Sequence, residues 1–145
     1  MVKAIERSDQ LLDATIRMDE ETVAEIMEEV HQSNTSPQFY NNEQALRSVV
    51  IMAYLSSVDD YMKFEEIASG RGYCDILFVP AKGSDKPALL IELKWDKKAK
   101  RAMEQITEKN YIKVLEKFKY QGEVLLVGIS YQTKTGKHEC KIRKI

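Results

Sequence analysis

The chain has 145 residues, of which 43% are hydrophobic and 31% are charged, and its net charge at pH 7 is −1. This composition is that of a soluble globular protein, and the length predicts one domain with a real core. No apolar run approaches the roughly 18 residues that span a bilayer, and the N-terminus lacks the apolar segment of a secretory signal. We therefore expect no membrane association and a cytoplasmic location.

The near-zero net charge conceals two oppositely charged halves. Residues 1–66 contain 5 basic and 14 acidic residues, whereas residues 67–145 contain 17 basic and 9 acidic residues. Either the basic half binds a polyanion or the two halves pair with each other, and the sequence favours neither explanation. The isoelectric point near 6.2 argues against indiscriminate coating of DNA.

Two helices and a connector are predicted before residue 39. The first covers residues 8–17, and Asp19 is the expected N-cap of the second, because acidic residues follow it and apolar residues then recur at helical spacing. The second helix is predicted to end near His31, which we interpret as a solvated residue at the helix end. Residues 32–38 are rich in Ser, Asn and Thr and contain Pro37, so they form a connector.

A third helix, three strands, a long helix and two further strands complete the predicted order. Asn41 or Asn42 is the expected cap of the third helix, and Glu43 lies in its first turn, where a carboxylate favours the helix dipole. The other elements are predicted at 61–67, 70–94, 99–119, 123–131 and 138–145, and the stretch 70–94 contains two strands with the buried runs 76–79 and 88–91. Cys74 and Cys140 each lie in a predicted strand and are interpreted as buried, reduced thiols.

Three charged residues lie at the ends of two strands that read as buried. If these strands form a hairpin closed around Gly83 and Ser84, paired residue numbers sum to 167, and Asp75 lies opposite Glu92. Lys94 points to the same side as Glu92, because side chains alternate along a strand. Opposed carboxylates repel unless a cation lies between them, so this arrangement predicts a magnesium site with a lysine beside it.

The chemistry of phosphodiester hydrolysis suits these residue types. A hard cation neutralises the phosphate and lowers the pKa of a bound water. The carboxylates of Asp75 and Glu92 and the main-chain carbonyl of Leu93 could bind it, and Lys94 could hold the attacking water or stabilise the developing charge. On the pattern alone, a salt bridge from Lys94 to Asp75 or Glu92 is an equally weighted alternative. Glu139-Cys140-Lys141 has the same spacing as Glu92-Leu93-Lys94, and no partner for it is evident in the sequence.

Together with the phrases Gly-Arg-Gly-Tyr-Cys-Asp-Ile-Leu-Phe-Val-Pro and Ala-Leu-Leu-Ile-Glu-Leu-Lys-Trp, these residues resemble the PD-(D/E)xK nuclease superfamily. The resemblance is most specific to the nuclease-like domain at the C-terminus of bacterial AAA-ATPase-like proteins. It implies an α/β (α+β) fold with a restriction-endonuclease-like αβββαβ core, a central mixed sheet flanked by helices, and an N-terminal helical extension. We expect residues 1–38 to be the extension and residues 39–145 to be the nuclease-like domain.

The resemblance also implies the functional residues. Glu43, Asp75, Glu92 and Lys94 match the catalytic positions, and Gln105 and Tyr111 match positions of the following helix where the family often contacts substrate. Gln105 could instead belong to a local polar network, and Tyr111 could be a core aromatic residue. The implied cofactor is Mg²⁺ (or Mn²⁺), the implied substrate is nucleic acid, most of all DNA, and an ATPase domain is expected upstream in a longer protein.

Two functions of different classes follow from the sequence. The first is a magnesium-dependent nuclease. The second is a non-catalytic module that uses the nuclease fold to bind nucleic acid or protein beside an ATPase, and its binding would survive loss of Glu92 and Lys94.

Overall fold

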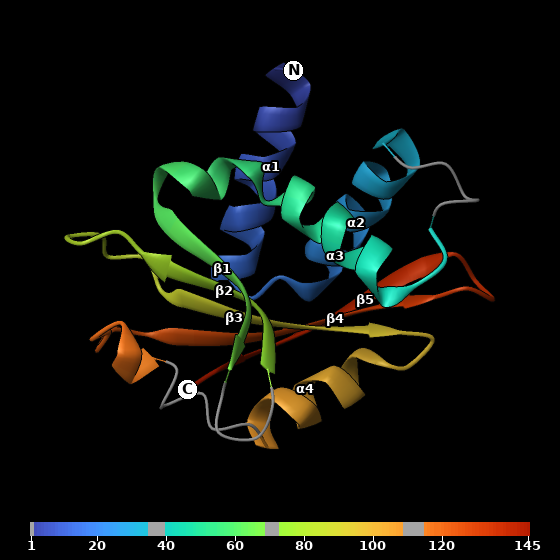
Figure 1. Cartoon of the computed structure of the whole chain (residues 1–145). Coiled ribbons are helices and arrows are strands. Elements are labelled where there is room, and N and C mark those ends of the chain that lie inside the picture. The colour runs from blue at the N-terminus through green and yellow to red at the C-terminus, as the bar shows by residue number, and fades with distance from the viewer. Residues whose placement is uncertain (1, 35–39, 69–72, 109–114) are drawn as a thin grey trace.

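The computed structural model describes residues 2–34, 40–68, 73–108 and 115–145 (Figure 1). Its elements are α1 (Val2–Ile16), α2 (Glu20–Asn34), α3 (Glu43–Ala53), η2 (Leu55–Asp59), β1 (Tyr61–Ala68), β2 (Tyr73–Pro80), β3 (Ala88–Trp95), α4 (Ala99–Glu108), β4 (Val124–Gln132) and β5 (Lys137–Lys144). No helix within these ranges is both long and apolar enough to cross a membrane.

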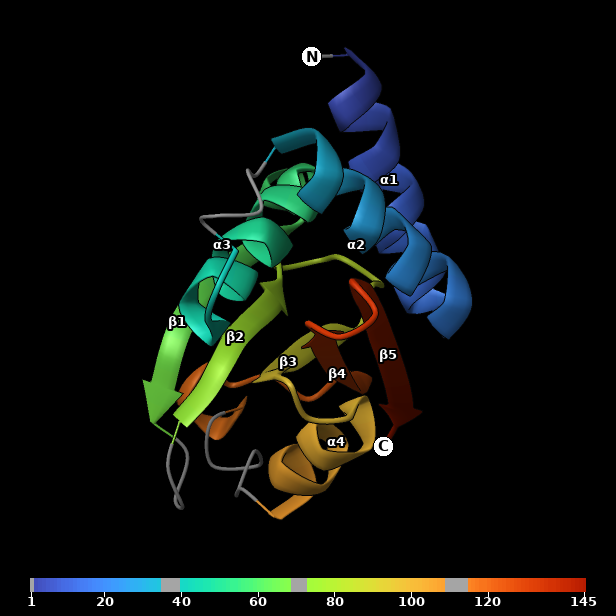
Figure 2. The ribbon, with the colours of Figure 1, turned by 90° about the vertical axis from the view of Figure 1, so that its right-hand side faces the viewer.

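The five strands form one mixed sheet in the order β1-β2-β3-β4-β5. All neighbours are antiparallel except β3 and β4, which are parallel because the segment containing α4 crosses over between them. Helices α1, α2 and α3 cover one face, and α4 covers the other (Figure 2). The predicted fold class is therefore confirmed: a mixed sheet flanked by helices, consistent with the restriction-endonuclease-like fold.

Alternation of side chains along the strands separates two cores. Ile76, Phe78, Ile91 and Leu93 pack with the helices of the first layer. Leu77, Leu90 and Leu126 belong to a second, smaller cluster with Met103 and Ile106 of α4. Both faces of the central strands are therefore buried, which explains why their sequences are nearly continuous apolar runs.

Both predicted helix caps are confirmed. Asp19 Oδ1 accepts a hydrogen bond from the Thr22 amide at 3.2 Å, and Asn42 Oδ1 accepts one from the Ala45 amide at 2.8 Å. The Asn42 cap fixes the start of α3 and places Glu43 in its first turn. The predicted lengths of the first two helices were wrong, since α1 begins at Val2 and α2 continues to Asn34.

Helix α2 runs along the outer edge of β5 and closes it. Glu20 accepts a hydrogen bond from the Ile142 amide at 2.7 Å, and Glu28 accepts one from the His138 amide at 3.3 Å. Glu20 and Glu28 are eight residues apart on a helix, about 12 Å. Their partners on β5 are four residues apart on a strand, about 13 Å, so the spacing of the carboxylates matches that of the amides. The unpaired amides of an edge strand are thereby satisfied by carboxylates, which protects this edge from pairing with another chain.

The interpretation of His31 as a solvated residue was wrong. Its ring stacks on Tyr40 with the centroids 3.7 Å apart, and the rings of Tyr131 and His138 lie within 5.6 Å. The Tyr40 hydroxyl is 2.7 Å from His138 Nε2. This aromatic cluster joins α2, β4 and β5, and it lies on the face of the sheet that the first three helices cover.

The long helix predicted over 99–119 is divided. Helix α4 ends at Glu108, and a helical turn at 115–117 lies out of line with it in both views (Figures 1 and 2). Residues 109–114 lie outside the described part of the chain. The buried stripe predicted for the first half of this helix is confirmed, because Ala99, Ala102, Met103 and Ile106 are all buried.

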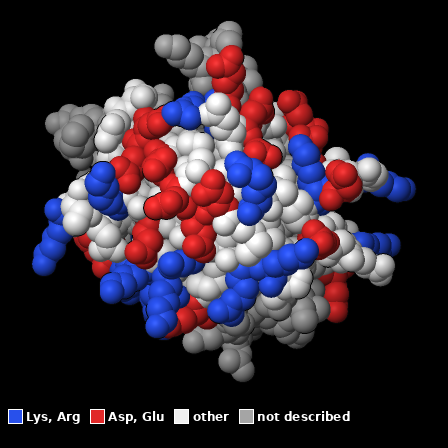
Figure 3. Space-filling model, turned by 180° about the vertical axis from the view of Figure 1, so that it is seen from behind, with Lys and Arg blue, Asp and Glu red and all other residues white. Residues whose placement is uncertain are grey.

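The two oppositely charged halves of the sequence are joined by few ion pairs. Among the ion pairs between described residues, Lys86–Asp60 at 2.7 Å and Lys137–Glu28 at 3.4 Å connect them. Seen from behind, acidic side chains gather on the upper half of the surface and basic side chains on the lower half (Figure 3). Within the described residues, ion pairs therefore join the two halves at these two points.

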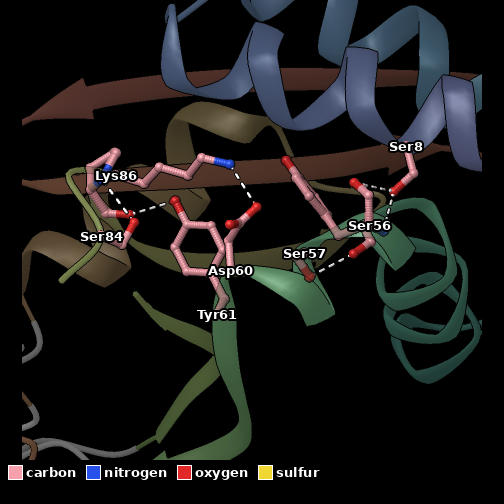
Figure 4. A network of polar contacts seen from close by, with 9 residues as sticks. Ser8, Ser56, Ser57, Asp60, Tyr61, Ser84 and Lys86 are labelled. Atoms are coloured by element: carbon pink, nitrogen blue, oxygen red, sulfur yellow. Dashed lines mark hydrogen bonds and ion pairs between the residues drawn. The ribbon is translucent and has the colours of Figure 1, made fainter. Parts of the chain in front are cut away.

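Polar contacts fix the start of β1 to its surroundings (Figure 4). The Ser56 amide donates to Ser8 Oγ of α1 at 2.7 Å, and the Tyr61 hydroxyl donates to the Pro87 carbonyl at 2.7 Å. The Lys86–Asp60 ion pair lies beside the second contact. The Tyr61 and Lys86 contacts hold the loop between β2 and β3, at the end of the hairpin opposite to Asp75 and Glu92.

The two cysteines are buried and free, as predicted.

Candidate active site

The register of the β2–β3 hairpin is the one predicted from the sequence. Ile76 pairs with Ile91, Leu77 with Leu90, and Phe78 with Leu89, so each pair sums to 167. The turn has Gly83 at φ +89°, a conformation that favours glycine. The ladder ends at Ile76, and the next positions along the same register are Asp75 and Glu92.

Beyond the ladder, the Asp75 side chain takes the place of a main-chain partner. Asp75 Oδ2 accepts a hydrogen bond from the Leu93 amide at 2.9 Å. The amide and carbonyl of one strand residue point to the same neighbouring strand, whereas those of the next residue point to the other. The Ala88 amide bonds toward β4, so the odd-numbered residues of β3 face β2. The Leu93 carbonyl therefore also faces the side on which the Asp75 carboxylate lies.

Glu92 lies on the α4 face of the sheet. It follows Leu90 by two residues, and Leu90 belongs to the cluster beneath α4. Asp75 lies beyond the last paired residue of β2, at the same end of the hairpin. Glu92 is only 3% exposed, whereas Asp75 is half-buried. Burying an ionised carboxylate is costly, so the position of Glu92 requires a compensating interaction.

Glu43 approaches the end of the β2–β3 hairpin from α3, which lies on the face of the sheet opposite to α4. Helix α3 packs on the opposite face of β3, but its first turn lies within electrostatic range of the hairpin end. Burial raises the pKa of Glu43, and the Asp75 carboxylate raises it further, while Lys94 is the strongest of the cations that lower it. The structure therefore brings Glu43, Asp75 and Lys94 together as one electrostatic group.

Lys94 does not form the salt bridge that the sequence left open. It is half-buried on the same face as Glu92, and it makes no ion pair within 4.0 Å to any residue that the structure describes. Its ammonium group influences Glu43 at longer range.

Helix α4 places Gln105 close to the second core, but Tyr111 lies outside the described residues. The Gln105 Oε1 atom is buried and has no hydrogen-bond partner in the described part of the chain. The helix approaches β4 very closely at Gly128. A Cβ atom at that position would lie 2.9 Å from the Ala99 carbonyl oxygen and 3.1 Å from Ala102 Cβ.

Sequence reasoning missed two polar residues that lie in the same row as Lys94, where residues of β3, β4 and β5 pair side by side. Ser130 pairs with Lys94 across β3 and β4, and its hydroxyl is fully buried with no partner among the described residues. Glu139, the next residue in the row, accepts a hydrogen bond from the Ala99 amide at 2.8 Å. The interpretation of Glu139 as unpartnered was wrong, because it caps the first turn of α4. A hydroxyl within the otherwise apolar run 124–131 was the available signal for Ser130.

The donor set at the hairpin end suits a hard divalent cation. Asp75 and Glu92 offer carboxylate oxygens and Leu93 offers a carbonyl oxygen, which are the ligand types that Mg²⁺ binds while it retains several waters. No three Asp, Glu, His or Cys side chains come together as a metal-binding group in the described ranges.

A mixed sheet with an acidic pair and a lysine where two strands part defines the restriction-endonuclease-like class of folds. The chain belongs to the PD-(D/E)XK nuclease superfamily, whose family model matches residues 41–141. The match includes α3, β1 to β4, α4 and most of β5, and so every residue of the candidate site. No curated protein matches the chain significantly.

Proposed function

We propose that this protein is a Mg²⁺-dependent (or Mn²⁺-dependent) nuclease that hydrolyses phosphodiester bonds in DNA. The observation that carries the proposal is the hydrogen bond from the Leu93 amide to Asp75 Oδ2 at the end of the β2–β3 hairpin, beside the buried residue Glu92. Membership of a nuclease superfamily supports the same conclusion. We also propose that the chain is the C-terminal domain of a AAA-ATPase-like protein, because its motif phrases resemble those of such domains.

Each residue has a distinct proposed role. Asp75, Glu92 and the Leu93 carbonyl would hold the cation, which supplies charge neutralisation of the phosphate and a water of lowered pKa. Lys94 holds the attacking water or stabilises the charge that develops on the phosphate. Glu43, whose pKa is raised by burial and by Asp75, is a candidate for proton transfer. Gln105 and Tyr111 are proposed to contact the substrate.

Calorimetric titration of Mg²⁺ and Mn²⁺ into the wild type and Glu92→Ala tests the proposal, with cleavage of plasmid and single-stranded DNA followed in the same buffers. Asp85→Asn serves as the control, because Asp85 is an exposed carboxylate in the loop between β2 and β3. We expect metal binding and cleavage to vanish together in Glu92→Ala and to persist in the control. Equal metal affinity in the wild type and Glu92→Ala would refute the assignment.

Asp75→Asn tests the site through stability rather than activity. The amide oxygen still accepts the Leu93 hydrogen bond, while the repulsion between Asp75 and Glu43 is removed. We expect this variant to be more stable than the wild type in EDTA, and to lose the stabilisation by Mg²⁺, which for the wild type is about 2.7 kcal/mol at 100 times the dissociation constant. Destabilisation in EDTA would instead indicate a structural ion-pair cluster.

The non-catalytic alternative has one observation in its favour. The acidic side chains gathered on the upper half of the surface in Figure 3 form a face that a basic partner domain could contact. In that case, Glu92→Ala and Lys94→Ala would leave partner or nucleic-acid binding unchanged, and the wild type would show no cleavage with either metal.

A further inference from the structure

A groove of about 550 Å³ lies between α4 and β5, apart from the candidate active site. Three cationic side chains line it: Lys100 from α4, and Lys141 and Arg143 from β5. All three are exposed, and none forms an ion pair with another described residue. Lys141 and Arg143 are two residues apart on one strand, about 7 Å, so they point to the same side.

Two carboxylates also line the groove, and both are engaged elsewhere. Glu20 accepts the hydrogen bond of the Ile142 amide at the edge of β5, at 2.7 Å. Glu104 forms an ion pair with Arg101 on its own helix, at 3.4 Å. Glu104 is thus balanced by Arg101, whereas Glu20 keeps its charge while it accepts from a neutral amide. With three cations and two carboxylates in its lining, the groove has a net positive charge, and its three cations are open to an anion.

The groove and the candidate active site lie on opposite flanks of α4. Glu92 pairs with Gly128, and Gly128 pairs with Lys141, so the three residues form one row across β3, β4 and β5. Two strand spacings separate Glu92 from Lys141, about 10 Å. Helix α4 crosses this row directly above Gly128. A polymer with repeated negative charges could thus contact both flanks of one helix.

We propose that the α4–β5 groove binds the phosphate backbone of the nucleic acid on which the candidate active site acts. The substrate class rests on the proposed function, but the groove itself rests on charge and shape. Its remaining lining, Met103 and Ile142, is apolar and without an aromatic face or hydrogen-bonding group for a base. We therefore assign the cations of the groove to phosphate contacts, which position the strand.

Salt dependence of binding, measured in EDTA so that no cleavage occurs, tests this role. Fluorescence anisotropy with a labelled 20-base-pair DNA duplex and with its single strand gives the slope of log affinity against log salt concentration. In Lys141→Gln/Arg143→Gln, the duplex slope should become shallower by about 1.8, because each phosphate contact contributes about 0.9. Between 50 and 200 mM salt the wild type then loses roughly 12-fold more affinity than the variant.

Two further variants make the result specific. Lys82→Gln/Lys117→Gln removes the same charge at exposed positions outside the groove and should leave the slope unchanged. Glu20→Gln removes a negative charge from the groove while its amide oxygen still accepts from Ile142, so it should strengthen binding. Equal slopes for the wild type and the groove variant on both DNA forms would overturn the proposal, as would weaker binding by Glu20→Gln in a folded protein.

The outcomes separate this proposal from the proposed activity. In one outcome, the wild type cleaves DNA with metal while its salt slope does not depend on Lys141 and Arg143. That result would refute the groove proposal and support the proposed nuclease activity. A wild type that binds DNA through the groove but cleaves nothing would refute the nuclease and support the groove. A wild type that binds neither DNA form in EDTA would overturn the groove proposal.

Discussion

Lowering the pH from 7 to 5 is expected to destabilise the protein by about 2 kcal/mol through His138 alone. Burial, and to a smaller extent the neighbouring His31, lower the pKa of His138 to about 3. In the unfolded chain an imidazole titrates near 6.5, so below that pH the unfolded state gains a proton that the folded state excludes. The contribution of His138 to the free energy of unfolding is fully present above pH 6.5. Below that pH it falls by about 1.4 kcal/mol for each pH unit. His31 has its own pKa lowered by burial, partly offset by Glu28, which adds to the loss in the same direction.

Urea unfolding at pH 5, 6 and 7 measures this effect when the wild type is compared with Tyr40→Phe/His138→Phe. The double substitution removes both partners of the 2.7 Å hydrogen bond, so no buried polar group of this pair is left behind. His31 remains in both proteins, and its own titration largely cancels in the comparison. The wild type should lose about 2 kcal/mol more than the variant between pH 7 and 5. Equal losses in the two proteins would show that His138 does not carry the pH dependence.

Three other substitutions test the framework of the site. Gly128→Ala should destabilise the protein by about 1–3 kcal/mol, because its Cβ would press on the Ala99 carbonyl oxygen and force α4 away from β4; urea unfolding measures this. Asn42→Ala should cost about 1 kcal/mol by removing the cap of α3, with Asn41→Ala as the neutral comparison, since Asn42 alone makes the capping bond. Lys94→Gln should raise the pKa of Glu43 still further, because the substitution removes a cation that lowers this pKa. NMR titration of the Glu43 carboxyl group measures the change. An unchanged pKa would contradict the electrostatic coupling between the two residues.

The hairpin that carries the site could be predicted because its determinants are local. Two apolar runs of similar length, a turn with a glycine at positive φ and strict alternation are enough to set the register of Leu77 with Leu90. The caps at Asp19 and Asn42 were predictable for the same reason, since each acts on an amide three residues away.

Features that depend on distant parts of the chain were not predictable. His31 has the sequence context of a solvated helix end, but the fold brings Tyr40 and His138 against it. Glu139 lies in a strand with alternating charges, and its role as the cap of α4 depends on the packing of a helix 40 residues earlier. Likewise, the pairing of Lys94 with Ser130 depends on a parallel crossover that no local pattern encodes. Single-sequence patterns report neighbours along the chain, whereas these contacts arise from topology.

The electrostatics of the candidate site differ from those of a structural ion pair, and this difference is what the proposed cation would explain. A cluster that stabilises the fold places opposite charges in contact, as Lys86 and Asp60 do at 2.7 Å. At the hairpin end, the Asp75 carboxylate instead raises the pKa of Glu43, and Lys94 makes no ion pair with a described residue. Like charges held together at a partly buried position reduce the free energy of unfolding unless something else neutralises them. Residues arranged at such a cost are characteristic of functional sites, where the ligand supplies the missing charge when it binds.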